Sequence, residues 1–309
     1  MRDYQAADAA LRPLLQQRPV PADVQVQVGL LHARRGNEAG ARAAFEAALD
    51  ASPESLEALS GLVTVDLERQ QVAAARQRID RVATNRKDDP QVLKIASRVF
   101  RAEGDLRGAE AALRRALERL PADGEAALLL ADCLSAGRRH ADAKQVLDQL
   151  LERQPSSVAA QLAVGAVLER MGRRNEAEAR YERILAEDPG SPTAAARLAL
   201  LHVSGHKNLD VTLSFLGEAR RTSPEDPDVL DALGWVYLHK DLGTLAIRNL
   251  EDAARANPRH PGYQYHLGVA YARLGQPQNA RTALARSLAL DEGFAERPQA
   301  EAAIAALPR

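Results

Sequence analysis

Cysteine, aromatic residues and an excess of either charge are all scarce in this sequence of 309 residues. The single cysteine, Cys133, has no partner for an internal disulfide, and its apolar neighbours predict a buried thiol. Aromatic residues make up only 4%, so the core must be built from Ala, Leu and Val, which argues against an aromatic-lined cofactor cavity. The 41 Lys and Arg residues balance 42 Asp and Glu, so the basic charge that nucleic-acid binding requires is missing and we expect no nucleic-acid partner.

Sequence signals for a membrane span or a catalytic centre are missing as well. No apolar run approaches the ~20 residues that cross a bilayer, and there is no glycine-rich phosphate loop, HExxH or CxxC motif. His202 and His206 are four residues apart, a spacing that on a helix places two metal ligands together. Gly205 lies between them near the expected helix end, however, and the sequence offers no third ligand. We therefore expect no enzyme, no cofactor and no metal site.

The stretch from Pro227 to Pro258 has the apolar periodicity of two helices. Apolar or small residues recur at helical spacing over 230–237 and again over 246–253. A polar turn with a glycine, residues 239–243, separates the two runs. The pattern predicts a helical hairpin that is closed by a proline, with a period of about 34 residues.

A proline closes most of the hairpins at the same place in this period. The closing prolines are Pro19, Pro53, Pro121, Pro155, Pro189, Pro224 and Pro258. Their spacing is 34 residues, except for one double step in which Lys87 takes the closing place and one step of 35 in the repeat that contains 205–208. Repeats should therefore begin near Ala22, Leu56, Pro90, Gly124, Val158, Pro192, Pro227 and Pro261.

Small residues recur where the two helices of each hairpin should cross, and bulk at such a contact sets the distance between helix axes. The first helices carry Gly29, Val63, Ser97, Ala131, Gly165, Ala199, Gly234 and Gly268. The second helices carry Ala41, Ala75, Ala109, Ala143, Ala177, Thr212, Ala246 and Ala280. Larger residues should fill the space towards the next hairpin, at Phe45, Ile79, Leu113, Leu147, Tyr181, Leu216, Leu250 and Leu284.

This pattern resembles the tetratricopeptide-repeat (TPR) family over essentially all of the chain. The resemblance implies an all-α fold, an α-α superhelix in which residues 1–309 form a single right-handed solenoid of about eight hairpins. A half-repeat would occupy residues 1–21 and a capping helix residues 293–309. First helices would line the concave face. Glycines mark the turns between helices, but Gln70 replaces one of them and Gly137 comes one place early.

The resemblance implies a non-catalytic scaffold that binds a protein or peptide in the concave groove. The last two repeats are similar to large bacterial multi-repeat proteins, several of which are associated with cell-envelope or exopolysaccharide export. The alternative is a regulatory or substrate-recruiting arm of a larger enzyme, such as a glycosyltransferase. Because the first residues match the second helix of a hairpin, we expect a chain cut from a longer protein. Any export signal would then lie upstream of Met1, which leaves both bacterial cytoplasm and periplasm open, and the exposed half-repeat could self-associate.

Groove residues follow from the geometry of the family, in which the second, fifth, ninth and twelfth positions of each first helix face the groove. In the amino-terminal half the set is polar, with Glu57, Ser60, Thr64, Lys94, Arg98 and Arg101. In the carboxy-terminal half it is more apolar, with Leu128, Leu162, Ala166, Ala196, Leu200, Val203, Asp231, Trp235, Leu238, Tyr265 and Val269. The asparagines of a chaperone-type carboxylate clamp are missing. We expect a partner to dock apolar side chains near Trp235 and Tyr265, or else Trp235 to pack as core on the neighbouring hairpin.

Overall fold

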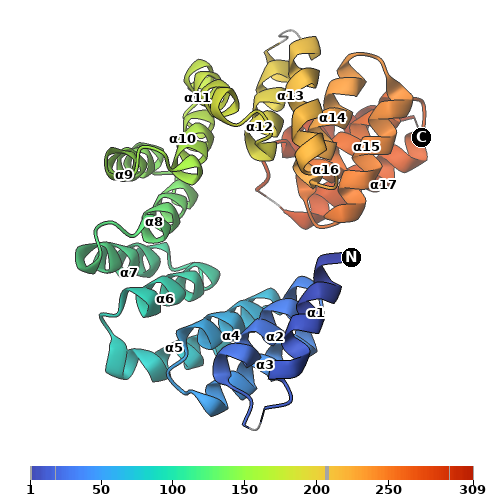
Figure 1. Cartoon of the computed structure of the whole chain (residues 1–309). Helices are drawn as coiled ribbons and strands as arrows, with labels where there is room; N and C mark the ends of the chain where they lie inside the picture. Colours follow the sequence, from blue (N-terminus) through green and yellow to red (C-terminus); the bar gives the residue numbers. More distant parts are fainter. Residues whose placement is uncertain (1, 18, 206–208, 292, 309) are drawn as a thin grey trace. The chain divides into compact units, whose positions relative to one another are not determined.

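A computed structural model describes residues 2–17, 19–205, 209–291 and 293–308, and all regular structure in these residues is α-helical (Figure 1). The chain divides into two compact units, Met1–Pro155 and Ser156–Arg309. The first unit contains α1 (Arg2–Leu14), α2 (Ala22–Arg34), α3 (Glu38–Ala51), α4 (Leu56–Glu68), α5 (Val72–Arg86), α6 (Pro90–Ala102), α7 (Leu106–Arg119), α8 (Gly124–Ala136) and α9 (His140–Arg153). The second contains α10 (Val158–Arg170), α11 (Arg174–Glu187), α12 (Pro192–Ser204), α13 (Leu209–Thr222), α14 (Pro227–His239), α15 (Gly243–Ala256), α16 (Pro261–Arg273), α17 (Pro277–Leu290) and α18 (Arg297–Ala306).

Helices α2 to α17 form eight hairpins, in which each even-numbered helix packs against the odd-numbered helix that follows it. Within each unit, the second helix of one hairpin also packs against the first helix of the next. At the two ends, α1 contacts α2 and α18 contacts α17. These contacts confirm the predicted all-α fold of hairpins, amino-terminal half-repeat and capping helix.

The crossing of the two helices in each hairpin is closed by the small residues that recur in the sequence. All eight second-helix positions are buried, from Ala41 to Ala280, and so are the eight larger residues from Phe45 to Leu284. A Cβ atom placed on Gly234 would lie 2.5 Å from Leu250 Cγ and 3.0 Å from the carbonyl oxygen of Ala246. Glycine is therefore required there by the close approach of α15, as predicted.

The turns inside the hairpins place one residue in the left-handed backbone region. Glycine occupies this place in four hairpins, for example at Gly104 with φ of +79°. In three others a residue with a side chain occupies it: Gln70, Arg138 and Asp241, each with φ near +58° to +59°. Gly137 does not serve this role, because its φ is −76° and the left-handed conformation falls on the next residue. At the four glycines a Cβ would meet nothing within 4 Å, so the backbone conformation alone favours glycine.

Replacing Ala246 by leucine should overpack the crossing of α14 and α15 and lower the free energy of unfolding by ~1–3 kcal/mol. Thr244→Leu is the matched control, since Thr244 is exposed on the same helix and surface changes usually stay within about 0.5 kcal/mol. Urea denaturation of both variants measures the difference. Equal midpoints for Ala246→Leu and the parent chain would contradict the close crossing.

Replacing Gln70 by glycine should stabilise the first unit by roughly 0.5–1 kcal/mol. The left-handed conformation costs a residue with a Cβ about 1–2 kcal/mol, and glycine avoids this cost. Glycine also raises the conformational entropy of the unfolded chain, which offsets part of the gain. The neighbouring Gln71 has a φ of −86°, so Gln71→Gly serves as the control and should not stabilise. Gly104→Ala should have the opposite effect to Gln70→Gly. Denaturation midpoints measure all three, and a lower midpoint for Gln70→Gly would contradict the argument.

Candidate functional site

First helices of successive hairpins lie beside one another within each unit. In the first unit α2 contacts α4, α4 contacts α6 and α6 contacts α8. In the second unit α12 contacts α14, which contacts α16. Side chains that point away from the second helices therefore come together on neighbouring first helices, and the predicted groove residues belong to these faces.

A groove of about 420 Å³ runs over this face of the first unit and is lined by residues of α2, α4, α6 and α8 alone. Apolar side chains line part of it, including Leu30, which is exposed, and Leu129. Polar side chains line the rest, among them Lys94, Arg98 and Glu125. The groove thus combines apolar contact area with charged groups, which is the composition of many binding sites for peptides.

Two of the three predicted cations of this face are neutralised by the next hairpin. Lys94 is buried, and its ammonium group lies 3.0 Å from Asp123 and also donates to Glu125. Burial alone would lower the pKa of Lys94, but these two carboxylates outweigh it and the pKa is raised. Arg101, half-buried, donates to Asp132. Neither cation is therefore available to a partner without breaking an ion pair.

Arg98 differs from these two, because in the described part of the chain no carboxylate forms an ion pair with it. Its Nη2 donates to Thr64 Oγ1 at 2.7 Å and its Nη1 donates to Ser60 Oγ at 3.3 Å, both on α4. Burial lowers the pKa of Arg98, since the charged form loses hydration, and the more distant carboxylates of Glu125 and Glu68 offset this only in part. The guanidinium group is thus held in a fixed orientation on the groove by hydroxyl groups, without an opposite charge in contact with it.

Trp235 lies half-buried on α14. Its exposure is therefore intermediate between the two expected roles, a contact residue of the groove and a core residue. One face of its ring stacks on His266 at a centroid distance of 4.2 Å, and its edge contacts His239 at 4.6 Å. Tyr265 is also half-buried, with its ring 6.2 Å from that of Trp235. Trp235 packs against the buried cluster of α14, α15 and α16 and still keeps exposed area. Trp235 and Tyr265 thus lie side by side on adjacent first helices.

His266, on which Trp235 stacks, is held in place by a buried carboxylate. Nδ1 of His266 lies 2.7 Å and 3.0 Å from the two carboxylate oxygens of Asp231, and both side chains are buried. Beside this pair, Tyr263 donates its hydroxyl hydrogen to Asp228. Burial and that carboxylate raise the pKa of Tyr263. This set of polar contacts joins α14 to α16 and orients the surface on which Trp235 lies.

The remaining predicted groove residues divide into half-buried and buried side chains. The half-buried residues, which keep surface for a partner, are Leu128, Leu162, Ala166, Leu200 and Val269. The buried residues, which offer little surface, are Ala196, Val203, Asp231 and Leu238. Leu128 lies in the first unit, and Val269 packs against the same buried cluster as Trp235 and against a second cluster that Tyr265 also contacts. The structure therefore brings together Trp235, Tyr265 and Val269, while Leu162 and Ala166 lie on α10.

Two further polar groups are buried at contacts between helices. Asp66 is fully buried on α4, where its carboxylate lies 2.7 Å from Arg42 of α3 and 2.7 Å from Arg78 of α5. No local motif marks such a residue, since both partners come from other helices. His202, considered with His206 as a metal pair, has its Nδ1 2.7 Å from Thr212 Oγ1 and its Nε2 3.4 Å from Glu178. His206 lies outside the described residues.

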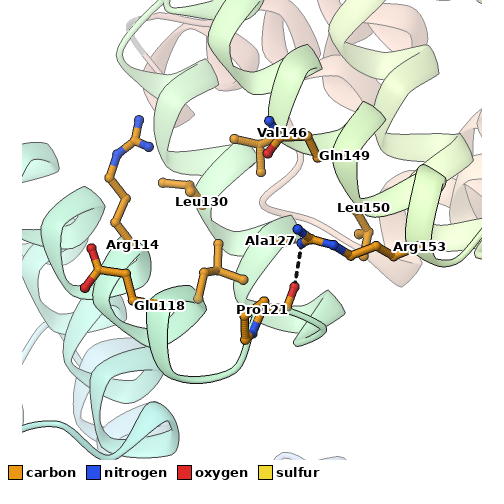
Figure 2. A pocket seen from close by; sticks show the side chains of 10 residues that line it. Arg114, Glu118, Pro121, Ala127, Leu130, Val146, Gln149, Leu150 and Arg153 are labelled. Atoms are coloured by element: carbon orange, nitrogen blue, oxygen red, sulfur yellow. Dashed lines mark hydrogen bonds between the residues drawn. The ribbon is translucent and has the colours of Figure 1, made fainter.

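A second pocket of the first unit, about 300 Å³, lies between α7, α8 and α9 (Figure 2). Leu130 of α8 and Leu150 of α9 line it, with Arg114 at one side. Arg153 donates to the carbonyl oxygen of Pro121 at 2.7 Å and so ties the end of α9 to the turn before α8. Two of its three helices, α7 and α9, are second helices, so this pocket lies away from the first-helix face on which the groove was expected.

Comparison with known proteins follows the same repeats. Models described as tetratricopeptide repeat match residues 32–99 and 100–167, residues 1–55 and 232–301, and residues 158–201. The chain belongs to the tetratricopeptide-repeat family. TPR repeats indicate a scaffold for protein–protein interaction. No curated protein matches this TPR chain.

Three solved structures are similar to the TPR chain. A tetratricopeptide repeat protein from Parabacteroides merdae has a TM-score of 0.59 and 15% identity, over 81% of this chain and 98% of its own. A chain of the APC/C hetero-tetramer Cut9–Hcn1 has a TM-score of 0.63 and 13% identity, over 96% of this chain and 58% of its own. A thermophilic TPR protein of Thermus thermophilus has a TM-score of 0.51 and 20% identity, over 58% of this chain and 97% of its own. At these identities the likeness shows the fold alone.

None of the TPR helices in the described residues has both the length and the hydropathy needed to cross a bilayer.

Replacing Asp231 by alanine should destabilise the second unit by about 1–3 kcal/mol, because His266 would be left buried without its partner. The emission of the single tryptophan should change with it, since Trp235 stacks on that ring. Asp231→Asn keeps an oxygen acceptor and should lose less stability. Thermal unfolding followed by Trp235 fluorescence measures both variants, and an unchanged midpoint for Asp231→Ala would contradict the role of the pair.

Proposed function

We propose that this TPR chain is a non-catalytic scaffold whose first-helix faces bind an extended or helical peptide segment of a protein partner. The guanidinium group of Arg98, held by hydroxyl groups on an apolar-lined groove, is the observation that carries the proposal. A partner with an acidic side chain next to apolar residues fits this groove. Its carboxylate would meet a pre-oriented cation, and hydrogen bonds between charged groups contribute about 1.5–3 kcal/mol.

The aromatic pair of the second unit supports a further contact with apolar side chains of a partner. Trp235 and Tyr265 both keep exposed area and lie on adjacent first helices, with Val269 beside them. Aromatic residues at the centre of an interface often dominate its binding energy. The stack on His266 limits the freedom of the Trp235 ring before binding, which lowers the entropy lost when a partner docks.

The setting that we propose is an assembly of the bacterial envelope or of polysaccharide export. It is supported by the resemblance of the last two repeats to large bacterial multi-repeat proteins. Identifying the partner tests this setting, and it also separates a scaffold from the recruiting arm of a larger enzyme, since an arm would bind substrates of that enzyme.

A peptide array probed with the full chain tests the proposed binding mode. Each peptide on the array carries one aspartate or glutamate among apolar residues, and its partner peptide carries asparagine or glutamine at that place. We expect the acidic member of each pair to bind more tightly, and Arg98→Gln to weaken that binding by about tenfold or more. Arg107→Gln is the matched control, because Arg107 is exposed on the second helix α7 of the same unit and should leave binding unchanged.

Fluorescence of the single tryptophan tests the aromatic contact separately. Iodide should quench Trp235 in the free chain, and a bound peptide should protect it. Light scattering over a concentration series is run first, because exposed Leu14 and Leu15 at the end of α1 would also support self-association of the half-repeat. Equal binding of acidic and amide peptides would contradict the role of Arg98, and a tryptophan that iodide cannot reach would contradict the role of Trp235.

A further inference from the structure

Three side chains of the second unit, separate from the groove, bring metal-binding atoms together. Glu178 and Glu182 lie one turn apart on α11, and His202 lies on the neighbouring helix α12. One ligand atom from each lies within 4.8 Å of the other two. Glu182 is exposed and Glu178 half-buried, whereas His202 is only 5% exposed. The group therefore opens to solvent on one side and has a buried imidazole on the other.

The two ring nitrogens of His202 contact different neighbours. Its Nδ1 lies 2.7 Å from the hydroxyl of Thr212, a buried residue of α13. When Nδ1–H donates to that hydroxyl, the lone pair of Nε2 points away from Thr212. Metal-bound histidines typically donate their second ring N–H in this way, which fixes the tautomer. The Nε2 atom then lies 3.4 Å from Glu178 Oε1.

This distance matches the geometry of a small first-row metal ion. Nitrogen and carboxylate ligands bind zinc at about 2.0–2.2 Å, so two of them at a tetrahedral angle are separated by roughly 3.3–3.6 Å. The 3.4 Å between His202 and Glu178 falls in this range. Glu182 is exposed, so its side chain has the rotamer freedom to bring its carboxylate to the same ion as the third ligand.

The charges of the group also favour a cation. Two carboxylates four residues apart on a helix repel one another, and a divalent ion between them removes that cost. A ligand set with imidazole nitrogen favours zinc, nickel, copper or iron over magnesium and calcium, which prefer oxygen ligands.

We propose that Glu178, Glu182 and His202 bind one divalent first-row transition-metal ion, with Zn²⁺ as the reference ion and solvent in the fourth position. The ion would join α11, in the repeat that begins at Val158, to α12, in the following repeat, whose length is 35 instead of 34 residues. It would act as a structural link in the least regular part of the array, independent of peptide binding in the groove.

Titration of the untagged 309-residue chain with ZnCl₂ in a calorimeter tests the proposal. We expect one saturable site per chain, and visible d–d absorption of the four-coordinate type when Co²⁺ replaces Zn²⁺. Glu182→Gln, Glu178→Gln and His202→Gln should each weaken binding by more than about tenfold, and Thr212→Val by about 10–100-fold. Glu187→Gln is the matched control, because Glu187 is an exposed glutamate of α11 outside the group and should leave binding unchanged.

If His202→Gln fails to fold, the zinc affinity of Glu182→Gln still tests the proposal, because the exposed Glu182 side chain contributes little to the core. Zinc that binds Glu182→Gln and Glu178→Gln as tightly as the parent chain would overturn the proposal, because the ion would then lie elsewhere. The absence of a saturable event up to millimolar Zn²⁺ would overturn it as well, and the contact between His202 and Glu178 would then be an ordinary hydrogen bond.

Discussion

The close crossing of two helices inside every hairpin is the constraint on which the rest of the structure depends. Residues such as Ala41 and Ala246 are buried at that crossing, and a Cβ at Gly234 would already be too close to α15. The short distance between the axes leaves room for a large side chain only opposite a glycine or another small residue of the first helix. The larger residues of the second helix are buried: Leu250, for example, lies against Gly234 of its own hairpin and in the cluster shared by α14, α15 and α16. Stacking of hairpins follows from the need to bury these residues.

The same constraint decides which residues remain for function. With one side of each first helix used for the crossing and another for the neighbouring hairpin, a narrow strip of positions is left over. Arg98 and Trp235 both belong to this strip, in separate units, and both are half-buried. Half-burial suits binding, because such side chains are oriented by their neighbours and still have surface to lose.

The fold could be predicted from the sequence because its determinants are local and periodic. A period of 34 residues, closing prolines and small residues at fixed places specify a hairpin without information from elsewhere in the chain. The left-handed turn is specified less locally than the helices. Gly137 is adjacent to the place that needs glycine, yet Arg138 takes the strained conformation, since helix α8 ends at Ala136 and the register of the turn is set by its neighbours.

The binding surface was harder to predict, because charge compensation acts between hairpins. Lys94 pairs with Glu125 and Arg101 with Asp132, in each case 31 residues further along the chain. An offset of 31 residues is one repeat of 34 residues minus about one helical turn. It therefore joins residues that face the groove on neighbouring first helices. The residue 31 places after Arg98 is Leu129, an apolar residue that lines the same groove. The sequence thus contains the signal that sets Arg98 apart from the other two cations, but the signal has meaning only once the stacking of the hairpins is known. Buried Asp231 and Leu238 illustrate the same point, since Asp231 pairs with His266 of α16 and Leu238 lies in a buried cluster with residues of α15 and α16.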